Sequence, residues 1–199
     1  MTTIRSAATL AVTVATLLVP ALSRADSWVL DASHSTAAFK VRHMMVSWVR
    51  GEFGKLSGTV EYDAKAPASA KVDISIDAAS IDTRDPKRDG HLKNPDFFDV
   101  AKFPTLTFKS KAVRNVTKAG FDLVGDLTMH GVTKEVVLKV EGPSAAITGP
   151  WGKTRMGASG TTVLNRQDFG VSWSKTMDKG GLVAGNEIHV ELEVELIKK

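Results

Sequence analysis

Cysteine is absent from this chain of 199 residues. Without it the protein has no disulfide bond, no thiolate metal site and no catalytic thiol, although an exported protein could form disulfides. The sequence also lacks the His-Glu-x-x-His pattern of zinc peptidases, the Gly-x-Ser-x-Gly turn of serine hydrolases and a glycine-rich phosphate loop. None of the 5 histidines has a partner at metal-ligand spacing. We therefore predict no catalytic residue, no metal ligand and no cofactor.

Charge of one sign is not concentrated in any segment. The sequence holds 26 Lys and Arg against 22 Asp and Glu, a net charge of +4, and basic and acidic residues alternate along most of the chain. Proteins that bind nucleic acid usually gather Lys and Arg on one face. The alternation therefore predicts that nucleic acid is not a partner.

The chain has one long hydrophobic run, at its N-terminus. Residues 7–22 are apolar apart from three threonines and one proline, Arg5 precedes them, and small residues at Ser23 and Ala25 follow. This order predicts a secretory signal peptide over residues 1–25, and hence a periplasmic protein with no stable membrane anchor after cleavage. The alternative is a membrane anchor, for which the run is only just long enough. Residues 26–199 contain no linker or repeat, which predicts a single domain.

Apolar and polar residues alternate in segment after segment of this remainder. The clearest case is 188–196, where every second residue is Ile, Val or Leu and those between are His or Glu. Such alternation is typical of antiparallel strands with one buried face. The segments concerned are 37–43, 56–63, 71–77, 105–109, 121–129, 136–140, 156–164 and 188–196. About eight such strands predict an all-β protein closed as a barrel or packed as a two-sheet sandwich, and the short connections favour the barrel.

Small side chains occupy the inward positions of one of these strands. Ala158, Gly160 and Thr162 stand where neighbouring strands carry large apolar residues. A barrel of about eight strands either fills its interior or holds one ligand, and small inward residues favour an internal cavity. The alternative is that the glycine marks a bulge or a barrel corner.

A short helical insert around residues 85–100 interrupts the strands. Asp85-Pro86 is a typical helix start, and Asn94-Pro95 is a typical end. Phe97 and Phe98 follow, and two exposed phenylalanines would be unfavourable, so the insert is expected to pack across one end of the barrel. It acts either as a plug or as a lid, with Phe97 or Phe98 touching a ligand.

Several motifs, in this order along the chain, resemble the YceI-like family of bacterial periplasmic proteins. They are Trp28-Val29-Leu30-Asp31, Val41-Arg42-His43, Arg88-Asp89-Gly90-His91-Leu92, Phe97-Phe98-Asp99, Phe103-Pro104, Gly125-Asp126-Leu127-Thr128, His130-Gly131-Val132-Thr133 and Asp168-Phe169-Gly170-Val171. The likeness runs from Trp28 to Leu196. It implies an extended eight-stranded antiparallel lipocalin-like barrel that holds a polyisoprenoid, such as an isoprenoid quinone or a prenyl lipid, without chemistry on it.

The inward apolar residues are the candidate ligand contacts, although any one of them could be plain core. They are Phe39, Val41, Val60, Val72, Ile74, Ile76, Leu106, Phe108, Leu123, Leu127, Leu138, Leu164, Phe169 and Trp173. A polar head group would need donors near the mouth of the barrel. The candidates for that role, by residue type alone, are Arg42, His43, Arg50 and Arg166.

The resemblance and the residues together predict an exported lipid-binding protein that sequesters or transports a long-chain isoprenoid. One alternative is an enzyme of isoprenoid or quinone metabolism that uses the same cavity, which would need a polar residue with a perturbed pKa inside it. Another is a packed barrel that acts through its surface in a stress response. A homodimer that shares edge strands is a further expectation.

Overall fold

The computed structural model describes residues 25–178 and 180–199. The predicted signal peptide lies outside these residues except for Ala25. Within them, strands dominate. They are β1 (Asp26–Leu30), β2 (Thr36–His43), β3 (Ser47–Phe53), β4 (Leu56–Tyr62), β5 (Lys71–Asp77), β6 (Ile81–Asp82), β7 (Thr105–Arg114), β8 (Gly120–Met129), β9 (Val132–Glu141), β10 (Ile147–Thr148), β11 (Thr154–Asn165) and β12 (Ala184–Lys198). The helices are α1 (Pro86–Lys93) and four short 3₁₀ segments, η1 (Ala32–His34), η2 (Pro67–Ser69), η3 (Ala78–Ser80) and η4 (Arg166–Phe169).

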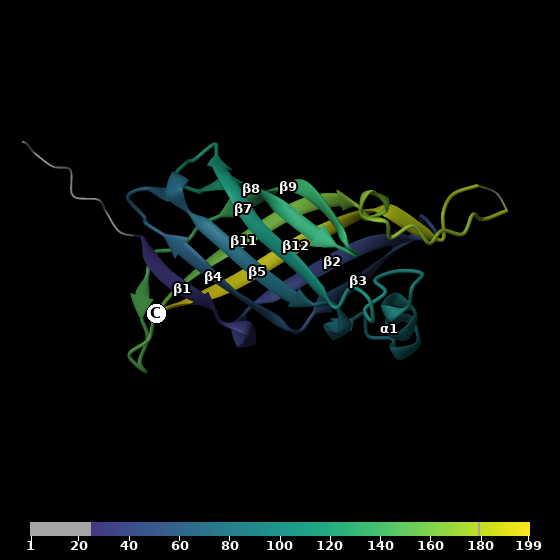
Figure 1. Ribbon diagram of the computed structural model, residues 1–199, viewed down its shortest axis with the longest axis horizontal. Helices are drawn as coiled ribbons and strands as arrows, with labels where there is room; N and C mark the ends of the chain where they lie inside the picture. The colour runs from purple at the N-terminus through teal and green to yellow at the C-terminus, as the bar shows by residue number, and fades with distance from the viewer. Residues whose placement is uncertain (1–24, 179) are drawn as a thin grey trace, which may run out of the picture.

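The strands close into a barrel. Eight of them follow one another in the order β11-β9-β8-β7-β5-β4-β1-β12, every pair is antiparallel, and β12 pairs back onto β11. The predicted eight-stranded antiparallel barrel is therefore confirmed, and the sandwich is not the fold. The barrel is elongated, and its strands cross the long axis obliquely (Figure 1).

Strand β12 holds the two halves of the wall together. Near its C-terminal end it pairs with β1, and over residues 188–193 it pairs with β2 on the same side. Strand β3 then continues from β2, and β6 from β3. Because η1 lies between β1 and β2, the chain leaves the wall briefly and returns to the same edge of β12. This arrangement lengthens the barrel.

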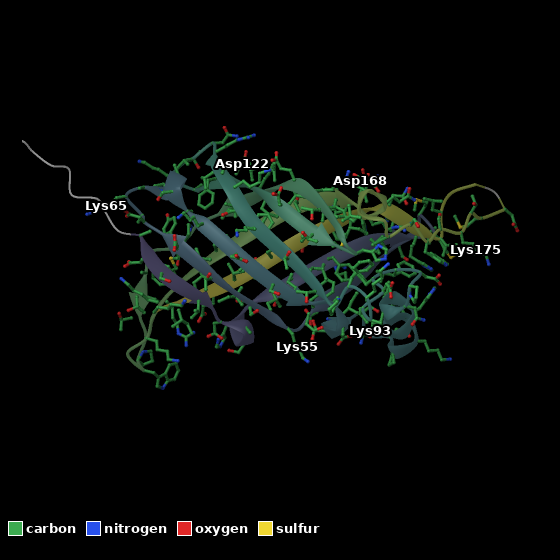
Figure 2. All side chains as sticks on the ribbon, viewed as in Figure 1. Lys55, Lys65, Lys93, Asp122, Asp168 and Lys175 are labelled. Atoms are coloured by element: carbon green, nitrogen blue, oxygen red, sulfur yellow. The ribbon has the colours of Figure 1, made fainter. Side chains whose placement is uncertain are left out.

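The alternation of apolar and polar residues along each strand determines which side chains face inward. In β12, Ile188, Val190 and Leu192 line the interior, whereas Glu191 and Glu193 are exposed. Charged side chains project outward elsewhere too, as Lys55 and Asp122 show in Figure 2. An antiparallel strand with one wet face permits this division because successive side chains point to opposite sides.

The insert forms as its capping residues predict. The Asp85 carboxylate accepts hydrogen bonds from the backbone N–H groups of Lys87 and Arg88, at 3.0 and 3.2 Å, and Asn94 ends α1. The helix lies at one end of the barrel (Figure 1), and Phe97, which follows it, is buried. The expectation that the insert packs across a barrel end is confirmed.

Candidate binding cavity

An apolar cavity of about 460 Å³ lies inside the barrel. This volume is within the range of small-molecule sites, roughly 300–1,000 Å³. Its wall includes Ala184 at the start of β12 and Leu196 near its end. At about 3.3 Å per residue, that stretch is roughly 40 Å long. The cavity is therefore a long slot, suited to an extended chain rather than a compact ligand.

Most of the predicted ligand-contact residues lie on this wall. They are Phe39, Val41, Val60, Val72, Ile74, Ile76, Leu106, Phe108, Leu123, Leu127, Leu138, Leu164 and Trp173. Phe97 and Phe98 of the insert also line it, as do the small residues Ala158, Gly160 and Thr162 of β11. Barrel closure brings the strand residues among them together because they share the inward parity of their strands, whereas Phe97, Phe98 and Trp173 lie outside the strands.

Phe169 and Arg50 lie elsewhere. Phe169, at the end of η4, is buried in the core at 2% exposure but does not reach the cavity wall. Arg50 is exposed on the outer face of β3, because its neighbour Val49 is the one that points inward. We therefore leave both out of the proposed ligand set.

The inward row of β12 is the main part of the wall that the predicted set left out. The alternation along residues 188–196 already places these side chains on one face of a strand, and that signal is sufficient to predict that they line the cavity. They are Ile188, Val190, Leu192, Val194 and Leu196. Thr83, Arg88 and His91 also reach the wall, and no pattern in the sequence indicates that the insert carries polar groups there.

Arg166 is a buried cation at the cavity wall. It is 4% exposed, and its guanidinium donates to the carbonyl oxygens of Gly185, Val171 and Ala184 and to Oδ1 of Asn186, at 2.7–3.3 Å. Burial lowers the pKa of Arg166. No carboxylate bonds to it among the described residues, so its charge faces only carbonyl dipoles. It ties η4 to the start of β12 and can still attract an electron-rich head group.

Arg42 and His43 lie at the same end of the barrel. Arg42 contacts the cavity wall, and its guanidinium lies 4.4 Å from the ring centre of Trp48, on the outer face. His43, the last residue of β2, contributes to the wall itself. Both therefore lie near the end of the slot, as the head-group hypothesis requires.

Three aromatic rings meet over the cavity beside the insert. The ring centres of His91 and Phe97 lie 5.0 Å apart, and Trp173 lies 5.5 Å from the first and 5.3 Å from the second. His91 is held in place by Asp96, 2.9 Å from its Nε2. The cluster joins the insert to the segment between η4 and β12, and it covers one end of the slot.

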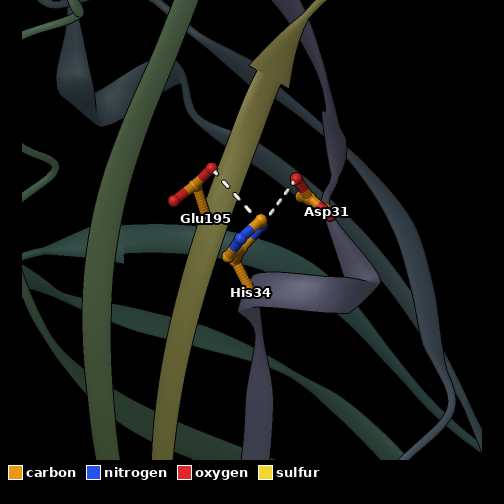
Figure 3. A group of neighbouring side chains, drawn as sticks. All are labelled: Asp31, His34 and Glu195. Carbon is orange, nitrogen blue, oxygen red and sulfur yellow. Dashed lines mark hydrogen bonds and ion pairs between the residues drawn. The ribbon is translucent and has the colours of Figure 1, made fainter. Parts of the chain in front are cut away.

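A second polar group lies outside the cavity, between η1 and β12. Asp31, His34 and Glu195 bring together ligand atoms that could hold a metal ion (Figure 3). The guanidinium of Arg155, however, bonds both carboxylates. Since an arginine already supplies the positive charge, the group is best explained as an ion-pair network that ties β1 and η1 to β11 and β12. Sequence spacing did not reveal it because Arg155 and Glu195 lie far along the chain from Asp31 and His34.

Replacing Asp31 by asparagine is expected to lower the free energy of unfolding by about 1–2 kcal/mol at pH 7. Hydrogen bonds from Ser33, Arg155 and His34 hold the pKa of Asp31 well below its usual range. A depressed carboxyl pKa stabilises the fold above the unfolded value of about 3.9, and this contribution is lost as the pH falls toward the folded value. The difference between the variant and the parent should therefore shrink between about pH 5 and pH 2.

Urea unfolding at neutral and acidic pH measures this difference. Asp73→Asn, on the exposed face of β5, is the control and should behave as the parent does. A difference for Asp31→Asn that stays constant across the pH range would show that the carboxylate does not contribute through its charge.

The closed antiparallel barrel around a long apolar slot places the protein in the class of hollow β-barrels that have room for one ligand. The family model of the YceI-like domain matches residues 28–196, and the chain belongs to this family. A UPF0312 protein of Vibrio cholerae is 34% identical over 187 residues, which cover 93% of this chain and 94% of that protein.

Solved structures show the same barrel. The YCEI protein of Campylobacter jejuni is 31% identical with a TM-score of 0.67, over 79% of this chain and 90% of that one. A polyisoprenoid-binding domain from Saccharophagus degradans is 17% identical with a TM-score of 0.63, over 88% of this chain and all of that one. The second likeness shows the fold alone. Among the described residues, no helix is long and apolar enough to cross a membrane.

Proposed function

We propose that this protein binds a long-chain isoprenoid lipid, either an isoprenoid quinone or a prenyl lipid, in the barrel slot and sequesters or transports it. The observation that carries the proposal is the shape and chemistry of the slot. It follows β12 from Ala184 to Leu196 and is walled almost entirely by aliphatic and aromatic side chains. A flexible hydrocarbon chain fits such a slot better than a compact polar metabolite does.

The apolar wall alone offers a gross binding free energy comparable with that of a micromolar ligand. Burying one CH₂ group contributes about 0.8 kcal/mol, so ten carbons contribute roughly 8 kcal/mol before the losses to ordering. That free energy corresponds to a dissociation constant of about 1 μM. One methylene more or less changes affinity by only about 1–3 kcal/mol, so we expect the protein to accept a range of chain lengths.

The polar groups on the wall support binding rather than catalysis. Thr83 donates to Asp89 and accepts from Arg88, and Arg166 donates to backbone carbonyls. A guanidinium does not release its proton to a ligand near neutral pH, and the Thr83 hydroxyl proton is held by the Asp89 carboxylate. A lipid carrier with no enzymatic activity is therefore the simpler proposal.

Membership of the YceI-like family and the name of the Saccharophagus domain agree with this class of ligand. The run over residues 1–25 supports export to the periplasm, where such a carrier would act. The expected homodimer stays a prediction.

Tryptophan fluorescence offers a direct test. Trp173 lines the cavity, whereas Trp48 and Trp151 are exposed and Trp28 is buried away from the wall. Adding a quinone with a long prenyl tail should quench the emission saturably, and a quinone without the tail should not. Trp173→Phe should reduce the amplitude of quenching, because the other three tryptophans lie away from the cavity wall. Quenching that never saturates with any long-tailed quinone would contradict the proposal.

A further inference from the structure

The turn between β2 and β3 holds apolar side chains in an unfavourable backbone conformation. Met44 and Met45 have φ values of 50° and 61°, and the turn is closed by the hydrogen bond from the N–H of Val46 to the carbonyl of His43, at 3.1 Å. Asn and Gly adopt this left-handed conformation far more easily than Met does. The exposures of Met44, Met45 and Val46 are 43%, 46% and 78%. These three residues, the apolar tip, are not part of the core.

Cations and an aromatic ring lie directly behind the apolar tip. Trp48 is 36% exposed, and the Arg42 guanidinium and Lys40 Nζ lie 4.4 and 5.8 Å from its ring centre. Arg50 lies on the same outer face of β3. Lys40 Nζ is paired with Glu191 of β12 at 2.8 Å, so Arg42 and Arg50 are the main cations of this face. From the tip of the turn toward the barrel, the surface therefore presents apolar side chains, then a tryptophan, then cations. This order is expected of a surface that inserts into the interface of an anionic bilayer.

The apolar tip is continuous with the end of the cavity. His43, which precedes it, lines the slot, and so does Val183, whose carbonyl oxygen accepts a hydrogen bond from the N–H of Met44 at 2.9 Å. Lys175 pairs with Val183 through the backbone, and its side chain lies at the same end of the barrel in Figure 2. A chain leaving the slot at this end would emerge beside the apolar tip.

A second exposed apolar turn serves as a comparison. Trp151 and Ile147 are 85% and 66% exposed, near the start of β11. The turn precedes β11, whose first residues pair with the C-terminal end of β12, whereas the apolar tip is next to the beginning of β12. Neither residue lines the cavity, and the left-handed position in that turn is taken by Gly152, so no strain is needed there.

We infer that the apolar tip, with Trp48, Arg42 and Arg50, docks on the surface of an anionic phospholipid bilayer. Docking there would let an isoprenoid chain pass between bilayer and slot without crossing water, a consequence that rests on the proposed function. The contact is peripheral and reversible, because three apolar side chains and a few cations do not make a stable anchor.

The test is sedimentation of purified protein with vesicles of phosphatidylethanolamine and phosphatidylglycerol that contain no isoprenoid. The double variant Met44→Asn, Met45→Gly removes both apolar side chains and supplies the residues that this turn favours. Its thermal midpoint should equal or exceed that of the parent, and its binding to the vesicles should fall by about tenfold or more. Weaker binding therefore cannot be attributed to unfolding.

Two controls isolate the surface. Trp151→Ser should bind as the parent does, and Arg42→Gln with Arg50→Gln should weaken binding by roughly fivefold per charge, an effect that high salt removes. Vesicles of phosphatidylcholine alone should bind weakly. All variants share one N-terminus, so differences between them come from the substituted residues.

The inference is overturned if the parent does not sediment with anionic vesicles, or if the Trp151 variant loses binding and the Met44, Met45 variant keeps it. Neither result would affect the conclusion from the quinone titration, because that experiment uses no bilayer. Conversely, vesicle binding without quenching of Trp173 would refute the proposed function and leave the docking surface in place.

Discussion

Replacing Ala158 by phenylalanine is expected to weaken binding of a long prenyl chain at least about hundredfold while the barrel stays folded. Ala158 lines the slot from β11, opposite Val194 of β12 in the strand register. A benzyl group there would occupy space needed by about four carbons of the ligand, and losing their burial removes roughly 3 kcal/mol. The change adds no charge and leaves the strand pairing intact.

The same substitution on the outer face is the matched control. Thr161 is exposed, on the same strand, and Thr161→Phe should bind the ligand as the parent does. Titration through Trp173 fluorescence measures affinity, and urea unfolding measures stability. If the barrel were packed rather than hollow, Ala158→Phe would instead destabilise it by about 1–3 kcal/mol through overpacking. Undiminished affinity in Ala158→Phe would place the ligand outside the slot.

Replacing Arg166 by leucine is expected to lower the free energy of unfolding by about 3–5 kcal/mol. The guanidinium donates to three backbone carbonyls and to Asn186. One of the three carbonyls belongs to Gly185, which is buried. Leucine would leave these acceptors without partners in a site that water cannot easily reach, and each such loss costs about 1–3 kcal/mol. Because lysine lacks the planar fork, Arg166→Lys should recover only part of the stability.

Urea unfolding at neutral pH measures both effects. Arg50→Leu is the control, since Arg50 is exposed on β3, and such surface changes usually stay within about 0.5 kcal/mol. Arg166→Leu with the stability of the parent would mean that the carbonyl contacts contribute little, and that the arginine is retained for another reason, such as attraction of a ligand head group.

The barrel could be predicted because its determinants are local. The alternation of apolar and polar residues along 188–196 predicts which face of β12 is buried, and the Asp85-Pro86 pair predicts where α1 begins. Both signals depend on neighbours only a few residues away. The need to hide every apolar face left a barrel and a two-sheet sandwich open, and the short connections favoured the barrel.

The polar contacts could not be predicted, because they join distant parts of the chain. Arg155 reaches Asp31, 124 positions away, and Arg166 bonds the start of β12 across a long loop. Residue type alone suggested Arg50 and Arg166 equally as head-group candidates. Only strand parity and burial separate them, since one lies outside the barrel and the other lies at its wall.

The most direct test of a lipid-binding slot is mass spectrometry of an organic-solvent extract from protein purified through its native export route. Parallel extraction of Ala158→Phe and Thr161→Phe provides the comparison. We expect one long-chain isoprenoid per barrel in the parent and in Thr161→Phe, and little or none in Ala158→Phe. A clean extract from the folded parent, together with no binding of added prenyl lipids, would contradict the account.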